Sequence, residues 1–177
     1  MEQPNLETSR LCLRPFTLTD ASAVQRLAGS YEVADTALNI PHPYKDGMAE
    51  EWIGSHASQF AAGTLVIYAI SLKGQDGIVG AVSLQVVKRH NRAELAYWMG
   101  RAYWGRGFTT EAAKALVQYG FEILKLHKIN ASHFKRNPAS GRVMQKLGMT
   151  HEGSLRDHFR KGDTYEDVEV YGLLADG

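Results

Sequence analysis

Residues 104–112, which read W-G-R-G-F-T-T-E-A, hold the residue types and spacing most suited to binding chemistry. They follow a strand-like segment at 93–99 and open a long helical pattern. A glycine-rich turn at the start of a helix leaves several backbone N–H groups without partners, and the helix dipole adds positive potential there. Small residues let a ligand approach this backbone closely. The pattern favours a site for a phosphate or pyrophosphate group, with a plain turn that binds nothing as the alternative.

The composition is that of an ordinary globular chain. Its 177 residues are 44% hydrophobic and 22% charged, with 20 Lys and Arg against 19 Asp and Glu. This length suits one domain over residues 1–177 with a core of its own. Because the net charge is only +1, no overall field attracts nucleic acid or an anionic membrane, and we expect neither as a partner.

Other features argue against several kinds of site and location. Cys12 is the only cysteine, so no internal disulfide forms, and its alternating surroundings are typical of a strand. The seven histidines show no paired spacing for a metal, and we expect no metal site. The start of the chain lacks the basic and apolar regions of a signal peptide, and no apolar run approaches the roughly 18 residues of a membrane span. We therefore expect a cytoplasmic protein.

Periodicity and turn residues predict an α+β chain built on one mixed sheet. The short turns between residues 65 and 99 indicate an antiparallel meander, and a later strand-helix-strand order adds a crossover. Residues 31–46, which carry three aromatic or imidazole side chains, are expected to form a loop. Strands are predicted at 9–14, 65–72, 78–87, 92–99, 127–132, 149–155 and 167–174, and helices at 18–29, 48–60, 109–125 and between Asn137 as cap and Gly148 as terminator.

This order and its motifs resemble the GNAT superfamily of acetyl-CoA-dependent N-acetyltransferases over essentially the whole chain. The likeness is strongest to the RimJ/RimL type, the ribosomal-protein N-terminal acetyltransferases and their relatives. It implies the GNAT fold, a mixed, mostly antiparallel seven-stranded sheet flanked by about four helices. The motifs that carry it are L-E-T-S-R-L at 6–11, L-R-P at 13–15, W-G-R-G-F at 104–108, E-A at 111–112, N-P-A-S at 137–140, K-L-G at 146–148, E-G-S-L-R at 152–156 and the ending at 167–171.

The resemblance implies acetyl-CoA as the co-substrate, with its pyrophosphate on the backbone amides of residues 106–110. The general GNAT signature falls on Trp104, Gly107 and Thr109, of which only Gly107 keeps the common residue, although tryptophan is usual in the RimJ/RimL type. The backbone N–H of Met99 is implied to face the thioester, while its side chain reads as core. The expected coenzyme-binding residues are Met99, Trp104, Gly105, Arg106, Gly107, Phe108, Thr109, Thr110 and Asn137.

Two residues are the expected catalytic groups. An amine must lose its proton before it attacks, and a carboxylate or an ordered water can accept that proton. The resemblance implies Glu94 as this base, with a salt-bridged strand glutamate as the alternative. Because strand side chains alternate, Glu94 and Met99 fall on opposite faces unless a bulge intervenes. Ser140 is the implied acid for the leaving thiolate, with a small packing residue of the helix as the alternative.

Two positions depart from the implied pattern. Many family members place a tyrosine acid where this chain has Met144, which cannot donate a proton. RimL-like enzymes also use a glutamate at the position of Phe159, whose neighbour His158 is a weaker candidate base than Glu94 or a water. The departure at Phe159 argues against a ribosomal-protein substrate.

The expected function is direct acetyl transfer, through a ternary complex, to a primary amine, possibly the N-terminal amine of a ribosomal or other protein. The alternatives are an acetyltransferase for a small amine, such as a polyamine, amino acid or aminoglycoside, and a non-catalytic acyl-CoA sensor. A nucleotide-binding protein is disfavoured because Gly-Lys-Ser/Thr is absent. Residues 31–46 are expected to cover the acceptor site, and a homo-oligomer is plausible. The basic cluster Lys128, His133, Lys135 and Arg136 reads as a solvated rim or a contact with the 3′-phosphate of CoA.

Overall fold

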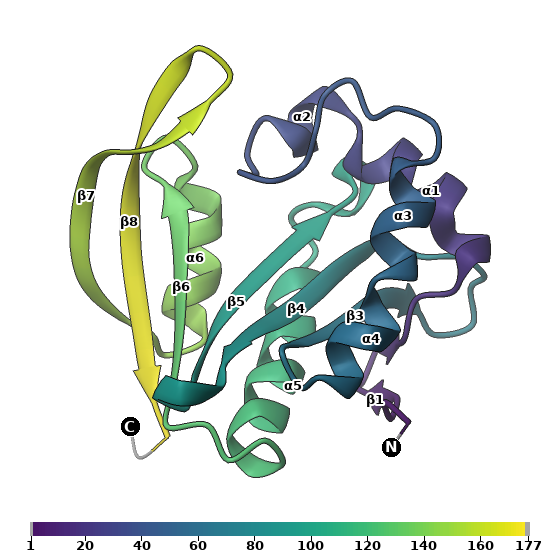
Figure 1. The fold of residues 1–177 in the computed structure, drawn as a ribbon, viewed down its shortest axis with the longest axis horizontal. Helices are drawn as coiled ribbons and strands as arrows, with labels where there is room; N and C mark the ends of the chain where they lie inside the picture. The colour runs from purple at the N-terminus through teal and green to yellow at the C-terminus, as the bar shows by residue number, and fades with distance from the viewer. Residues whose placement is uncertain (1, 176–177) are drawn as a thin grey trace.

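The computed structural model describes residues 2–175 and places them on an eight-stranded sheet with helices on both faces (Figure 1). Residue 1 and residues 176–177, which the expected domain includes, lie outside the described residues. The strands lie in the order β1-β2-β3-β4-β5-β6-β8-β7. They are β1 (Leu6–Glu7), β2 (Leu11–Arg14), β3 (Leu65–Leu72), β4 (Gly80–Val87), β5 (Arg92–Met99), β6 (Lys128–Phe134), β7 (Thr150–Lys161) and β8 (Thr164–Leu174).

The sheet is mixed and mostly antiparallel, as predicted. Only β5 and β6 run parallel; every other neighbouring pair is antiparallel. The predicted count of seven strands is wrong, because β1 is an additional strand that pairs with β2 through Leu6 and Leu13. Its two residues are too few to show the alternation by which a strand is recognised in sequence.

Residues 2–175 hold six α-helices rather than about four. One reason is that the helix predicted at 48–60 is interrupted at Ser55, whose Oγ donates to the carbonyl oxygen of Trp52 at 2.7 Å. A serine that competes for a helix carbonyl weakens the regular backbone ladder. The other reason is a short helix inside the expected loop 31–46. The helices are α1 (Ala21–Ala28), α2 (Tyr31–Ala34), α3 (Met48–Gly54), α4 (His56–Ala61), α5 (Phe108–Glu122) and α6 (Pro138–Lys146).

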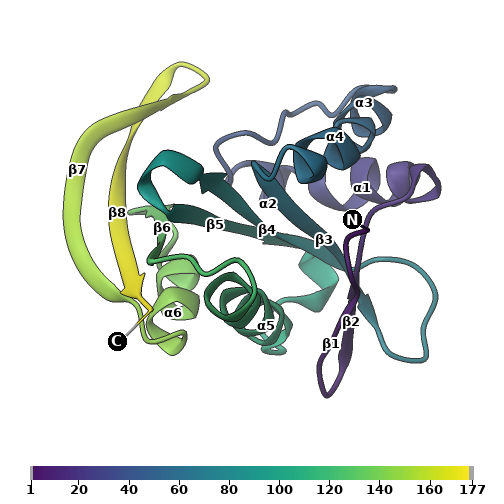
Figure 2. The same cartoon turned by 60° about the horizontal axis from the view of Figure 1, so that its bottom comes forward.

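The two faces of the sheet carry different helices, as the turned view in Figure 2 shows. Helices α5 and α6 cover one face, where Tyr68, Leu84, Leu116 and Ile129 form part of the main core, all less than 2% exposed. Helices α1 to α4 lie over the other face, and a smaller apolar cluster joins α1 and α3 to β3. The sheet therefore separates a helix-packed face from a face that is only partly covered.

Strand β5 leaves its parallel neighbour after a short contact. It pairs with β6 only from Arg92 to Glu94, opposite Lys128 to Asn130. On its other edge β6 pairs with β8 from Lys128 to Phe134, and the second half of β5 has no strand on the β6 side. Figure 1 shows the resulting divergence, with β6, β7, β8 and α6 on one side and β1 to β5 on the other.

Candidate active site

The turn before α5 has the geometry expected of an anion site. Gly105 and Gly107 have φ values of 73° and 77°, and Gly107 is the N-cap of the helix. A left-handed backbone of this kind is strained for any residue with a Cβ, which explains why both positions are glycine. The first backbone bond of the helix runs from the N–H of Glu111 to the oxygen of Gly107 at 3.0 Å.

A row of backbone amides at this turn has no partner within the protein. In the part of the chain from residue 2 to residue 175, no group accepts a hydrogen bond from the N–H of residues 106–110. Together with the dipole of the 15-residue helix α5, these amides suit the pyrophosphate of a nucleotide coenzyme. The predicted coenzyme-binding residues from Trp104 to Thr110 therefore lie together in one turn.

Glu111 fixes this turn to the start of the chain. Its Oε1 accepts hydrogen bonds from Thr8 Oγ1 at 2.6 Å, Ser9 Oγ at 3.0 Å and Arg10 N at 2.9 Å. Arg10 Nε donates to its Oε2 at 2.6 Å, and Arg10 Nη1 donates to the carbonyl oxygen of Arg106 at 2.9 Å. Burial opposes the charged carboxylate, but the bonds from Thr8 and Arg10 outweigh it and lower the pKa of Glu111 to about 2.

The end of β5 directs its backbone toward the gap left by β6. The N–H of Gly100 donates to Val79 at 2.8 Å, on the side of β4. Successive residues in a strand direct their backbone groups to opposite sides, so those of Met99 face the gap. The Met99 carbonyl oxygen there accepts a hydrogen bond from Trp104 Nε1 at 2.7 Å, which joins the α5 turn to the end of β5.

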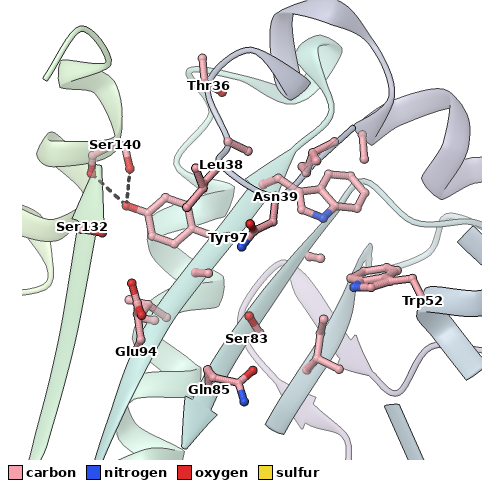
Figure 3. A pocket seen from close by; sticks show the side chains of 18 of the residues that line it. Thr36, Leu38, Asn39, Trp52, Ser83, Gln85, Glu94, Tyr97, Ser132 and Ser140 are labelled. Atoms are coloured by element: carbon pink, nitrogen blue, oxygen red, sulfur yellow. Dashed lines mark hydrogen bonds between the residues drawn. The ribbon is translucent and has the colours of Figure 1, made fainter. Parts of the chain in front are cut away.

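A pocket of about 920 Å³ opens beside β5, on the face of the sheet that α1 to α4 partly cover (Figure 3). Its floor is formed by β3, β4 and β5, and residues 36–41 and α3 form part of its wall. The lining contains two carboxylates, Glu51 and Glu94, and within the described chain it contains no lysine or arginine. The aromatic residues of the lining are Tyr44, Trp52, Tyr97, Trp98, Phe134 and Phe159.

Ser140 meets Tyr97 where β5 and β6 diverge, and both line the pocket (Figure 3). Tyr97 Oη donates to the Ser140 carbonyl oxygen at 2.9 Å and lies 2.9 Å from Ser140 Oγ. Burial raises the pKa of Tyr97 to about 12, so its hydroxyl stays protonated at neutral pH. The sequence reasoning looked for a tyrosine donor only on α6, at Met144, which is 1% exposed, and missed Tyr97. The sequence offered one clue: Tyr97 is two residues before Met99, so both side chains fall on the same face of β5.

Glu94 lines the pocket from the face of β5 opposite the buried Met99. The pairing of β4 with β5 is continuous from residue 92 to residue 99, so no bulge intervenes and the predicted alternation is confirmed. Among residues 2–175, no cation lies within 4.0 Å of the Glu94 carboxylate, which argues against a salt-bridged role. Phe159 is part of the pocket lining, and its neighbour His158 is not.

Asn137 occupies the N-cap position of α6, but the predicted cap through its side chain is wrong. Its backbone has φ −115° and ψ 70°, and its side chain makes no capping bond. Instead its backbone N–H donates to Phe134 at 2.8 Å, and its carbonyl oxygen accepts from the N–H of Ser140 at 3.2 Å. Pro138 starts the helix as predicted, because its missing N–H costs nothing at that position.

Residues 2–175 contain neither a candidate metal site nor a candidate membrane-spanning helix. No three His, Cys, Asp or Glu side chains are grouped so that they could hold a metal ion. No helix in that range has the length and apolarity needed to cross a membrane.

Comparisons with known proteins identify relatives of the chain. A family model described as "Acetyltransferase (GNAT) domain" matches residues 10–150. The chain is 32% identical over 171 residues to the "Uncharacterized N-acetyltransferase p20" of Bacillus licheniformis, covering 96% of this chain and 95% of that protein. The crystal structure of a GNAT-family acetyltransferase from Bacillus anthracis superposes with a TM-score of 0.88 at 24% identity, covering 98% of this chain and all of that one.

Two relatives from Escherichia coli (strain K12) match about half of the chain and differ in the acceptor that they name. "Ribosomal-protein-serine acetyltransferase" is 27% identical over 103 residues, 58% of each chain. "Spermidine N(1)-acetyltransferase" is 36% identical over 92 residues, 52% of this chain and 48% of that one.

Proposed function

The chain belongs to the GNAT family of acetyltransferases, and we propose that it moves the acetyl group of acetyl-CoA directly to a primary amine held in the pocket. One observation supports this most strongly. The turn with the unpartnered amides is joined to the end of β5 by the bond from Trp104 to Met99, and the pocket reaches the gap between β5 and β6 at Tyr97 and Ser140. A coenzyme held at the turn can extend its arm through that gap toward an amine in the pocket.

The binding roles follow from the placement of the residues. The amides of residues 106–110 would hold the pyrophosphate, and Trp104 would keep the turn against β5. The backbone N–H of Met99 would donate to the oxygen of the thioester carbonyl, where negative charge develops as the amine attacks. The side chain of Asn137, which does not cap α6, would contact the coenzyme arm.

The proton transfers would use groups on both faces of β5. Glu94, or a water that it orients, would take the proton from the ammonium so that the nitrogen lone pair attacks the carbonyl carbon. The tetrahedral intermediate then expels the CoA thiolate as the carbon–sulfur bond breaks, and its nitrogen releases a second proton to water to leave the neutral amide. Ser140 Oγ would give its proton to the sulfur and regain one from solvent, and the Tyr97 hydroxyl, which donates to the Ser140 carbonyl oxygen and lies 2.9 Å from Oγ, would hold the serine in place.

We propose a positively charged small amine as the acceptor. The two carboxylates Glu51 and Glu94, the aromatic lining and the lack of a lysine or arginine in the described lining suit a cation with an apolar body. A protein N-terminus is the second candidate, because it is also an ammonium and because one relative is named for a ribosomal protein while another is named for spermidine. A cytoplasmic location and a homo-oligomer stay predictions from the sequence.

An activity panel tests this function. Purified protein is given acetyl-CoA with a polyamine, an aromatic monoamine, a peptide with a free N-terminus and the same peptide blocked, and thiol release is measured. Binding of CoA and of ATP is measured alongside. Transfer to the small amines supports the proposal, transfer to the free peptide alone favours the second candidate, and CoA binding without any transfer supports a sensor. Stabilisation by ATP alone contradicts the function.

Substitution of the proposed acid tests the mechanism. We expect Ser140→Ala to lower kcat by about 10- to 100-fold with little change in the Kd for CoA, because it removes a proton donor rather than a binding contact. Ser58→Ala, on the exposed side of α4, is the matched control. Unchanged turnover in Ser140→Ala contradicts its role as acid, and unchanged turnover in Glu94→Gln assigns proton removal to water.

A further inference from the structure

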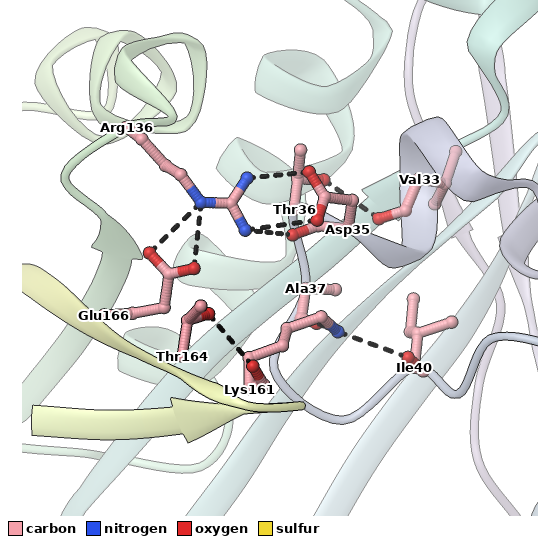
Figure 4. Close-up of polar contacts among 9 residues, drawn as sticks. All are labelled: Val33, Asp35, Thr36, Ala37, Ile40, Arg136, Lys161, Thr164 and Glu166. Carbon is pink, nitrogen blue, oxygen red and sulfur yellow. Dashed lines mark hydrogen bonds and ion pairs between the residues drawn. The ribbon is translucent and has the colours of Figure 1, made fainter.

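Residues 35–41, here called the acceptor loop, lead from α2 toward α3, and all but Asp35 line one side of the pocket (Figures 3 and 4). They hold almost no regular structure of their own. Two cations from the C-terminal half of the chain hold them in place, one from the β6–α6 turn and one from β7. The acceptor loop therefore spans from the β1–β5 side of the molecule to the β6–β8 side.

Arg136 makes the more extensive of the two contacts (Figure 4). Its Nε donates to both carboxylate oxygens of Glu166 on β8, at 2.9 and 3.1 Å. Its Nη1 donates to Asp35 Oδ2 at 2.7 Å, and its Nη2 donates to the Asp35 carbonyl oxygen at 2.8 Å. The planar guanidinium thus binds two carboxylates at once, a geometry that a lysine cannot reproduce.

Lys161 makes the second contact. Its ammonium lies at the end of β7 and donates to the carbonyl oxygens of Ala37 and Ile40, within the acceptor loop. Both carbonyls belong to pocket-lining residues. The backbone of the acceptor loop is therefore fixed at Asp35 by Arg136 and further along by Lys161.

The strength of the Arg136 network comes from its geometry and partial burial. Exposed ion pairs contribute about 0–1 kcal/mol to the free energy of unfolding on average, so a single exposed pair would hold the acceptor loop only weakly. Here the Glu166 side chain is only 12% exposed and the Asp35 side chain 34% exposed, and several charge-assisted bonds converge on one guanidinium. Arg136 is also four residues before Ser140, in the turn that leads into α6. It therefore links the acceptor loop to the helix that carries the proposed acid.

We propose that Arg136 is a positioning residue for acetyl transfer. It holds the acceptor loop over the amine and fixes the position of that loop relative to Ser140. This inference rests on the proposed function. It differs from the expectation that the basic cluster forms a solvated rim or contacts the 3′-phosphate of CoA, because the Arg136 guanidinium is engaged by Asp35 and Glu166. The acceptor, and not the coenzyme, is the ligand whose binding depends on Arg136.

Steady-state kinetics of Arg136→Gln test this role. We expect kcat/KM for the amine to fall about tenfold, mainly through KM, while KM for acetyl-CoA changes less than about twofold. Arg136→Lys is expected to be more active than Arg136→Gln but less active than wild type, because lysine keeps the positive charge without the planar guanidinium that binds two carboxylates. Arg160→Gln is the matched control, since Arg160 is an arginine on the β7–β8 hairpin beside Lys161, pairs with Asp163 and makes no hydrogen bond or ion pair with the acceptor loop.

Two further measurements separate positioning from a general loss of stability. Hydrogen exchange of the amides of residues 35–40 should be faster in Arg136→Gln and unchanged in Arg160→Gln, with little change in α5. In a double-mutant cycle, Asp35→Asn with Arg136→Gln should be no worse for the amine than Arg136→Gln alone, because both remove the same contact.

The outcomes distinguish this inference from the proposed function. An unchanged KM for the amine overturns the positioning role, and a rise confined to the KM for acetyl-CoA makes Arg136 a coenzyme ligand instead. Equal losses for both substrates with faster exchange throughout the protein also overturn it, in favour of a structural role. A wild-type protein that acetylates no amine contradicts the proposed function and this inference together.

Discussion

The α5 turn and the acceptor loop lie on opposite sides of β5, and each is fixed by an arginine and acidic partners. Arg10 and Glu111 hold the α5 turn, while Arg136, Asp35 and Glu166 hold the acceptor loop. The two regions differ in how much of their shape is fixed by local structure, apart from the arginine. The turn has two left-handed glycines and a 15-residue helix behind it, so its shape is largely local. The acceptor loop depends on side chains about 100 or more residues away.

Under the proposed function, the comparison teaches that the two substrates are handled by different kinds of structure. The coenzyme side uses backbone amides, whose direction depends on glycine conformation and helix geometry. The acceptor side uses a loop placed by long-range ion pairs and hydrogen bonds. Variants in the two regions should therefore affect different kinetic constants.

Among the three further variants that test this comparison, Gly107→Ala is expected to have the largest effect. A Cβ at φ 77° costs about 1–2 kcal/mol and turns the neighbouring amides away from the anion, so the Kd for CoA should rise about tenfold. Calorimetry measures this Kd. Gly74→Ala is the matched control, because Gly74 has φ 74° and open space around it but lies in the β3–β4 turn. Equal CoA affinity in both variants would contradict the comparison on its coenzyme side.

An intermediate effect, on the free energy of unfolding, is expected from Glu111→Gln, and it should depend on pH. Its folded pKa of about 2 lies below the ordinary 4.5, so the unfolded chain binds this proton more tightly. The stabilisation is complete above about pH 4.5 and is lost as the pH falls from 4.5 toward 2. We expect Glu111→Gln to be less stable than wild type by about 1–2 kcal/mol at pH 7.

Urea unfolding at pH 7, 4 and 3 measures this difference. The gap between wild type and Glu111→Gln should narrow as the pH falls, because the wild-type carboxylate becomes protonated. Glu50→Gln, on the exposed side of α3, provides the control. A gap of constant size across these pH values would mean that charge at Glu111 does not hold the turn.

The smallest effect is expected from Lys161→Met, which sharpens the acceptor side. The variant removes the donor to Ala37 and Ile40 but leaves the Arg136 contacts in place. We expect KM for the amine to rise about two- to threefold, with KM for acetyl-CoA unchanged. Lys114→Met, on the exposed face of α5, is the control. An effect larger than that of Arg136→Gln would reverse the ranking of the two contacts.

Much of the fold could be predicted from the sequence. The strands at 65–72 and 92–99 have the predicted bounds, because each is a continuous run with clear strand residues and turn residues at both ends. The mixed, mostly antiparallel sheet followed from short turns and one crossover. Three errors fall in the N-terminal half: the interruption at Ser55, the strand β1 and the helix α2. They concern a single hydrogen bond, a two-residue pairing and a four-residue helix, which periodicity does not register.

The candidate site divides in the same way. The glycines of the α5 turn and the first residues of α6 could be recognised, since their function depends on neighbours in the chain. Tyr97 beside Ser140 could not, because 43 residues separate them and only the divergence of β5 from β6 brings them together. The network of Arg136 was equally hidden, and the sequence assigned that cation to solvent or phosphate.

The sequence by itself determined the GNAT family, the sheet and the glycine turn before α5, because these rest on local propensities and on motifs short in sequence. Only the tertiary structure decided which hydroxyl faces Ser140, where Glu94 points and what holds the acceptor loop. These depend on side chains from distant segments that meet when the sheet and its helices pack. The physical reason is that backbone conformation is set largely by neighbouring residues, whereas contacts across a cleft are set by the whole fold.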